Sequence, residues 1–132
     1  MPEPTYLTPE ECPGIGLAAA CAVRKVPWLM GIKHRWCGVC DEDHAKEYRR
    51  FAHHVCFSDM ICWAFAAREL APEFQAGICL HEYGHVLAGG DPGESDFEAE
   101  QAADRAVYEK LGIEISYVGP AEIQWVDLGD LS

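Results

Sequence analysis

The chain has 132 residues, of which 49% are hydrophobic, and this length and composition suit one compact domain spanning residues 1–132. Its 22 acidic residues against 10 Lys and Arg give a net charge of −12, which disfavours binding to nucleic acid or to an anionic membrane surface. No segment approaches the roughly 20 continuous apolar residues of a membrane-spanning helix, and residues 1–12 lack the pattern of a secretion signal.

The N-terminal part of the sequence predicts a helix followed by a strand. Thr8 has the character of a helix N-cap and Pro9 that of a first helical residue, so we expect a helix that includes residues 17–23. Pro27 should end this helix. Residues 28–36 mix apolar and basic side chains in a way that is typical of a strand.

Two further short strands are expected within residues 51–65. This segment is rich in aromatic and branched side chains and is interrupted only by Ser58-Asp59, where a tight turn is predicted. In such a strand Ile61, Trp63 and Phe65 would share one face.

The segment 72–87 predicts a helix that opens at Pro72 and closes at the glycine pair after residue 88. The faces of this helix that do not carry histidines are apolar, so we expect the helix to lie in the core. Gly77 and Gly84 lie on one flank, where they permit the close approach of a neighbouring backbone.

A second strong helix is expected to follow. Ser95 and Glu98 form a capping box, and the helix should run to about Leu111 before Gly112 closes it. The remaining residues 113–118 and 123–126 fit either short strands or an extended tail.

The first of these two helices contains the motif His81-Glu82-Tyr83-Gly84-His85. Residues four apart lie on the same face of a helix, with Cβ atoms about 5–6 Å apart, so both imidazoles can reach one metal ion. Glu82 is turned by about 100° from His81, which places its carboxylate beside the metal, where it can take a proton from a metal-bound water.

The second helix offers the third protein ligand that a catalytic zinc needs. On a helical wheel Glu100 and Asp104 fall in the middle of the apolar stripe, where a carboxylate requires a cation or strong donors. We expect Glu100 to bind the metal and Asp104 to accept the far N–H of a ligating histidine, His81 in the first place. Glu98 is the weaker candidate because its position suits the capping box.

His81-Glu82-x-x-His85 followed by Glu100-x-x-x-Asp104 resembles the gluzincins, zinc metallopeptidases in which the HExxH helix faces a glutamate helix. The small size is similar to that of the minigluzincins and, more loosely, of the ImmA/IrrE-type peptidases of bacteria and phages. The resemblance covers residues 57–111. It implies an α+β fold, a minimal zincin-like domain with a small mixed sheet packed on the two helices, and an edge strand at 61–65 that binds substrate in extended form.

The activity that the resemblance implies is that of a zinc metalloendopeptidase. Zn²⁺ would lower the pKa of bound water to about 7 and polarise the scissile carbonyl, and Glu82 would act as general base and return the proton to the leaving amine. No histidine follows His85, so the group that stabilises the oxyanion stays open among Tyr83, Tyr108 and Tyr117. The expected partner is a peptide or protein substrate, with no nucleic acid and no membrane.

Two alternatives remain open. The chain can be a non-catalytic adaptor or regulatory protein that keeps a zinc-binding scaffold to engage a partner protein. It can also be a phage or mobile-element protein that cleaves a single regulatory target. The adaptor and the peptidase both predict bound zinc, and they differ in whether Glu82 is needed.

Cysteines and the remaining histidines suggest less specific roles. The seven cysteines cannot all pair within one chain, so we expect free thiols and a reducing, cytoplasmic location. Cys37-Gly38-Val39-Cys40, with His34 and His44 nearby, invites a second zinc site, but one CxxC supplies only two ligands and packed free thiols are the preferred interpretation. His53 and His54 point to opposite faces if they lie on a strand and are interpreted as ordinary strand residues.

Overall fold

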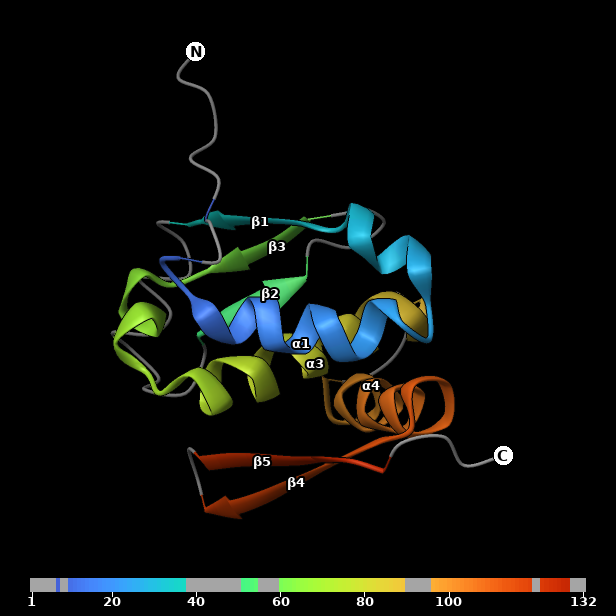
Figure 1. The fold of residues 1–132 in the computed structure, drawn as a ribbon. Helices are drawn as coiled ribbons and strands as arrows, with labels where there is room; N and C mark the ends of the chain where they lie inside the picture. Colours follow the sequence, from blue (N-terminus) through green and yellow to red (C-terminus); the bar gives the residue numbers. More distant parts are fainter. Residues whose placement is uncertain are drawn as a thin grey trace.

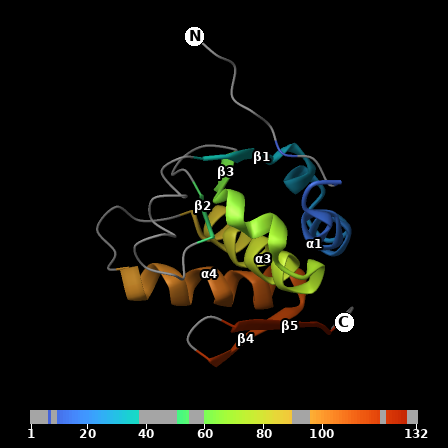
Figure 2. The same cartoon turned by 90° about the vertical axis from the view of Figure 1, so that its left-hand side faces the viewer.

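The protein is described by a computed structural model that covers residues 7, 10–37, 51–54, 60–89, 96–119 and 122–128. The fold has three layers in space: a three-stranded sheet, a layer of helices and a C-terminal two-stranded hairpin. The helices lie between the two sheets (Figures 1 and 2). The expected α+β class is confirmed. None of the helices in these ranges is long and apolar enough to cross a membrane.

The first helix, α1 (Pro13–Val23), begins later than the sequence predicted. Thr8 and Pro9 lie outside the described residues, and Glu10 and Glu11 are in a turn, so the helix starts with Pro13 at its first position. A tertiary contact fixes this start, because the Gly14 N–H donates a hydrogen bond to Oε1 of Gln75, a residue of the later helix α3, at 3.0 Å. Local helix-start signals at Thr8 carry no information about that partner.

The predicted strand at residues 28–36 is correct only in its second half. Pro27 opens the short 3₁₀ helix η1 (Pro27–Gly31), and the strand β1 is confined to Lys33–Trp36. The fixed φ of proline suits a helical turn, and the turn buries Leu29 at 1% exposure. The apolar side chains at 28–32 therefore belong mainly to a packed helical turn and not to a strand.

The strands β2 (Ala52–His54) and β3 (Met60–Trp63) confirm the pair predicted within 51–65, and the turn predicted at Ser58-Asp59 lies outside the described residues. The sheet order is β1-β3-β2, with β1 parallel and β2 antiparallel to β3, so the sheet is mixed as the resemblance implied.

Two details of the predicted strand at 61–65 are wrong. The strand β3 lies in the centre of the sheet, with a neighbour on each side, so it is no edge strand and offers no free edge to an extended substrate. Phe65 does not continue it, because residues Phe65–Glu69 form the 3₁₀ helix η2. Ile61 and Trp63 do share a face, and both are fully buried.

The two long helices agree with their sequence signals. Helix α3 (Pro72–Ala88) opens at Pro72 and ends at Gly89, whose φ of 81° gives the left-handed cap that glycine favours. Helix α4 (Asp96–Leu111) ends at Gly112 with φ of 65°. Ser95, the expected N-cap, lies outside the described residues.

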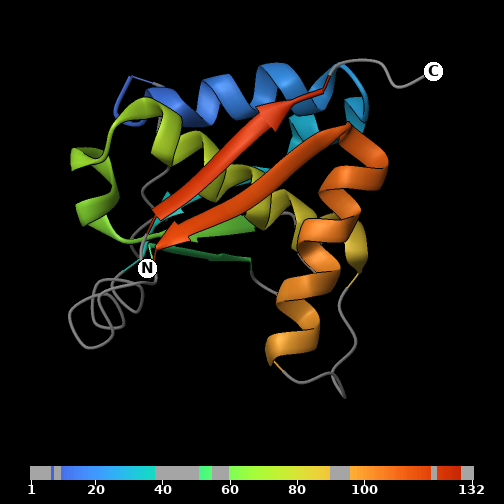
Figure 3. The same ribbon diagram turned by 90° about the horizontal axis from the view of Figure 1, so that it is seen from below.

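The C-terminal residues form an antiparallel hairpin, β4 (Ile113–Gly119) and β5 (Glu122–Asp127), which confirms the strand option. The hairpin lies across α3 and beside α4 (Figure 3). Trp125 Nε1 donates to the Glu73 carbonyl at 2.9 Å, and Arg24 forms an ion pair with Asp127 at 3.0 Å. These contacts tie the hairpin to α3 and α1.

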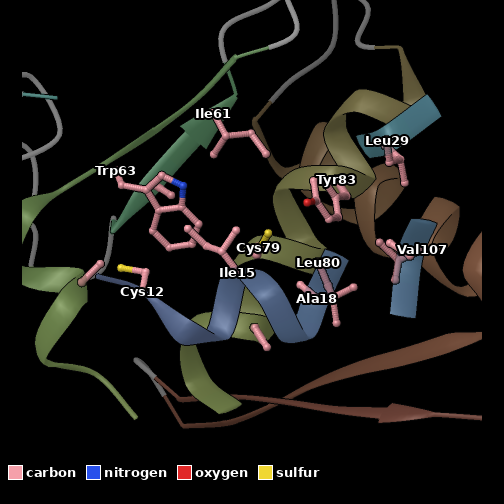
Figure 4. Close-up of a cluster of buried hydrophobic side chains, with 14 of the residues drawn as sticks. Cys12, Ile15, Ala18, Leu29, Ile61, Trp63, Cys79, Leu80, Tyr83 and Val107 are labelled. Carbon is pink, nitrogen blue, oxygen red and sulfur yellow. The ribbon is translucent and has the colours of Figure 1, made fainter. Parts of the chain in front are cut away.

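The core is built around the flank of α3 that carries Cys79, Leu80 and Tyr83, which pack with side chains of α1 and β3 (Figure 4). Gly14 lets α1 approach α3 closely, because a Cβ there would lie 2.3 Å from the Gln75 Cβ and from the Pro72 carbonyl oxygen. Packing thus fixes the rotation of α3 about its own axis, and with it the direction of the histidine face.

Candidate metal centre

Helix α3 presents His81 and His85 one turn apart on the side that faces α4. Their ring centroids are 4.8 Å apart and the rings are nearly perpendicular, at 86°. His81 is 9% exposed and His85 is partly buried. The two imidazoles therefore point into one region from a single rigid helix, as the four-residue spacing requires.

Helix α4 brings Glu100 to the same region. One carboxylate oxygen contacts His81 Nε2, and the other lies 3.2 Å from His85 Nε2. One ligand atom each from His81, His85 and Glu100 lie within 4.8 Å of one another, and this is the one such group of three or more metal-binding side chains within the described ranges. The three ligands that the sequence suggested are thus brought together.

A glycine sets the distance between the two helices. A Cβ at Gly84 would lie 2.3 Å from the Ala103 carbonyl oxygen and 2.9 Å from Val107 Cγ2. Only a residue without a side chain allows α3 to approach α4 this closely at the level of the histidines. The expectation for Gly84 is confirmed, whereas Gly77 meets the side chains of Ile123 and Trp125 on β5 and not a backbone.

The donor set fits a divalent cation such as zinc, which binds imidazole nitrogen and carboxylate oxygen. Burial acts to lower the pKa of His81, but hydrogen bonds to Asp104 and Glu100 and the charge of Glu82 raise it to about 10. Partial burial opposes ionisation of Glu100, yet its hydrogen bonds to His81 and His85 bring its pKa far below the usual range. The cluster therefore attracts positive charge, which a proton or a metal ion can supply.

Asp104 holds the far side of the His81 ring. Its Oδ1 lies 2.7 Å from His81 Nδ1, and its Oδ2 accepts a hydrogen bond from the Tyr117 hydroxyl at 2.8 Å. With the Nδ1 proton directed at Asp104, Nε2 faces Glu100 and His85, where a metal ion can replace the proton that Nε2 carries in the metal-free protein.

Glu82 lies next to His81 and is 6% exposed. Its carboxylate is outside the triad of ligand atoms, but it is close enough for its charge to raise the pKa of His81. A buried acid beside the ligands is the position from which a general base acts.

The carboxylates are less buried than the helical wheel suggested. The side chain of Glu100 is 54% exposed and that of Asp104 is 24% exposed, whereas Val107 and Leu111 on the same helix are buried. Glu100 lies near the start of α4, two turns before the buried Val107. The cluster is accordingly open to solvent on its Glu100 side.

The three tyrosines that the sequence left unranked are separated by the structure. Tyr83 is 1% exposed in the core, where burial and Cys79 raise its pKa, and Tyr108 is 47% exposed on α4. Tyr117 is 57% exposed, but its hydroxyl reaches the cluster from β4. Partial burial of that hydroxyl and the charge of Asp104 raise its pKa, so it keeps its proton. The alternation of Ile113, Ile115 and Tyr117 on one face of the strand is the signal that points to it.

The other histidines and cysteines do not form a second centre within the described ranges. His34 Nδ1 accepts a hydrogen bond from Trp63 Nε1 at 2.9 Å, and burial lowers its pKa to about 4. Cys40 and His44 lie outside the described residues, and His53 and His54 lie on β2. Among the described residues no disulfide joins the cysteines, which are Cys12, Cys21, Cys37, Cys62 and Cys79.

Comparison of the chain with protein-family models, with curated proteins and with solved structures finds no match. The case for a metal centre therefore rests on the geometry, burial and charge of the cluster itself.

Proposed function

We propose that this protein is a zinc-dependent metallopeptidase in which His81, His85 and Glu100 hold the ion and Glu82 is the general base. The observation that carries the proposal is the convergence of three ligand atoms within 4.8 Å of one another, two from α3 and one from α4. Such a set of three protein ligands leaves a fourth position for water or substrate. Solvent exposure of the Glu100 side chain supports an accessible position of this kind.

A zinc ion bound by two histidines and a glutamate supplies Lewis acidity, which lowers the pKa of a bound water to about 7 and polarises a carbonyl group. Asp104 keeps the Nδ1 proton on His81 and so directs Nε2 at the ligand cluster. The Glu82 carboxylate takes a proton from the attacking water and delivers it to the nitrogen of the leaving amine. Glu82 is 6% exposed, so most of its side chain is shielded from bulk water.

The proposed substrate class is a peptide or an unstructured segment of a protein. A net charge of −12 favours segments that are neutral or basic near the cleaved bond, because an acidic segment would be repelled. Cleavage of a single regulatory target is compatible with this proposal and would give low turnover on generic peptides.

The test compares Glu82→Gln with wild type in two measurements. The first is zinc content, and the second is hydrolysis of a mixed peptide library, with the products identified by mass spectrometry. We expect stoichiometric zinc in both proteins and a loss of turnover of about 10²–10⁴-fold in Glu82→Gln, since general base catalysis contributes about that much. Glu109→Gln, which changes an exposed glutamate near the end of α4, is the matched control and should behave as wild type.

Two results would count against the proposal. Wild type purified in the presence of zinc but containing none would remove the metal centre altogether. Stoichiometric zinc with no cleavage of any library peptide, together with partner binding that is unaffected by Glu82→Gln, would favour the zinc-binding adaptor.

A further inference from the structure

We propose that Tyr117 is a positioning residue of the metal centre, which fixes the Asp104 carboxylate and through it the orientation of the His81 ring. The inference rests on the proposed metal site and extends it to the C-terminal hairpin. The carrying observation is an unbroken set of contacts: the Tyr117 hydroxyl donates to Asp104 Oδ2 at 2.8 Å, and Asp104 Oδ1 lies 2.7 Å from His81 Nδ1.

Both oxygens of Asp104 are used in this arrangement. A carboxylate that meets a donor at only one oxygen can turn about its terminal torsion, which has a broad energy profile. A second donor at the other oxygen fixes the plane of the group and therefore the line along which it accepts the His81 proton. The Asp104 side chain is 24% exposed, so water would otherwise replace Tyr117 at Oδ2 without holding that plane.

The side of the ring that Tyr117 approaches argues against a direct role in catalysis. Its hydroxyl is 3.4 Å from His81 Nδ1, whereas His81 Nε2 faces Glu100 on the other side of the ring. The two ring nitrogens point in different directions. The Tyr117 hydroxyl therefore lies on the Nδ1 side of the His81 ring, away from the Nε2 side where a metal ion and its substrate would bind. Tyr117 therefore acts through Asp104 and does not serve as an oxyanion donor in this geometry.

The hairpin that carries Tyr117 is itself anchored to the metal-binding helix. Tyr117 on β4 is the cross-strand partner of Ile123 on β5, and Ile123 packs against Gly77, one turn before His81, where a Cβ would lie 3.0 Å from its Cγ2. Trp125 Nε1 donates to the carbonyl of Glu73 another turn earlier. A strand that is anchored to α3 thus carries the hydroxyl, as a positioning role requires.

The experiment measures zinc affinity by competition with a chromophoric chelator for wild type, Tyr117→Phe, Asp104→Ala and the double variant. We expect affinity to fall about 3–10-fold in Tyr117→Phe and about 10–100-fold in Asp104→Ala, since partners of ligating histidines contribute on that scale. In the Asp104→Ala background, Tyr117→Phe should cause no further loss, because its effect passes through Asp104. Tyr108→Phe, an exposed tyrosine of α4, is the control and should bind zinc as wild type does.

Two further readouts separate positioning from folding. The cobalt-substituted Tyr117→Phe protein should show a shifted visible absorption band, because the geometry of one ligand changes, while the melting temperature of the metal-free variant stays close to that of metal-free wild type. An unchanged zinc affinity and cobalt spectrum in Tyr117→Phe would overturn the inference while leaving the metal site intact. A full additional loss in the double variant would also overturn it, and a wild type that binds no zinc would refute the metal site and this inference together.

Discussion

Two histidines on either side of the core, His34 on β1 and His81 on α3, show how differently burial can act on the same side chain. Burial lowers the pKa of His34 to about 4, and its hydrogen-bond partner is Trp63. His81 is more deeply buried than His34, yet Asp104, Glu100 and Glu82 raise its pKa to about 10. The same residue is thus held neutral in one region and charged in the other.

The two histidines differ in the charge of the side chains around them. Near His34 the ring contacts are Trp63 and Tyr83, with centroids 6.0 and 6.1 Å away, and the region behaves as ordinary core. Around His81 the protein concentrates Glu82, Glu100 and Asp104, which is costly without a cation. Three carboxylates gathered around one buried imidazole indicate function more strongly than the buried histidine itself.

The largest difference between the two regions should appear when each histidine is removed. We expect His81→Ala to lower zinc affinity by more than about a hundredfold, since loss of an outer partner of a ligand alone costs about 10–100-fold. His34→Ala should keep stoichiometric zinc and lower the melting temperature, because it removes the acceptor of the Trp63 N–H. Metal content by mass spectrometry and thermal unfolding measure the two effects.

Glu100→Ala provides the check on the ligand assignment. It should lose zinc as His81→Ala does, and full retention of zinc in Glu100→Ala alone would show that another group is the third ligand.

Two glycines allow the same comparison at helix contacts. Alanine at Gly84 would clash with the Ala103 carbonyl at the α3–α4 contact, and alanine at Gly14 would clash with Gln75 at the α1–α3 contact, in each case at 2.3 Å. We expect each substitution to lower the free energy of unfolding by about 3 kcal/mol, because overpacking of close contacts costs about 1–3 kcal/mol or more. Urea unfolding of the metal-free proteins measures this.

Zinc affinity should then separate the two variants. Gly84→Ala moves Glu100 away from the histidines and should weaken zinc binding, whereas Gly14→Ala should leave the affinity of the folded protein unchanged. Equal affinities in the two variants would mean that the α3–α4 distance does not set the geometry of the cluster.

Local signals in the sequence predicted the parts of the molecule that hold the ligands. Pro72 and Gly89 mark the ends of α3, and Gly112 marks the end of α4, because the special backbone preferences of proline and glycine act where they stand. The spacing of His81 and His85 follows from helix geometry alone.

Features that depend on distant contacts were not predictable in the same way. The start of α1 depends on a hydrogen bond between Gly14 and Gln75, and the central place of β3 depends on which strands pair with it. Tyr117 comes to the site only because the hairpin folds back across α3. The alternation of Ile113, Ile115 and Tyr117 indicates which face of the strand is turned inward, but it does not say which helix that face packs against, and so the three tyrosines could not be ranked from the sequence.

The smallest predicted effect concerns pH and uses His34→Gln, in which the glutamine carbonyl can still accept from Trp63. The unfolded chain binds a proton at His34 near pH 6.5, whereas the folded protein resists it down to about pH 4. Neutral His34 therefore costs nothing above pH 6.5, and the folded state loses stability as the pH falls from 6.5 towards 4. Between pH 6.5 and 5 the wild type should lose about 1.6 kcal/mol more than His34→Gln, measured by urea unfolding of the metal-free proteins.

The difference between the two proteins isolates His34, because the acidic side chains titrate in both and cancel. His81 contributes little in this range, since it is protonated in the folded metal-free protein and increasingly protonated in the unfolded chain. Parallel pH profiles for wild type and His34→Gln would mean that His34 gains its proton as easily in the folded state as in the unfolded one. The difference in pKa between the two histidines would then come from the carboxylates around His81 alone. Burial would not lower the pKa of His34.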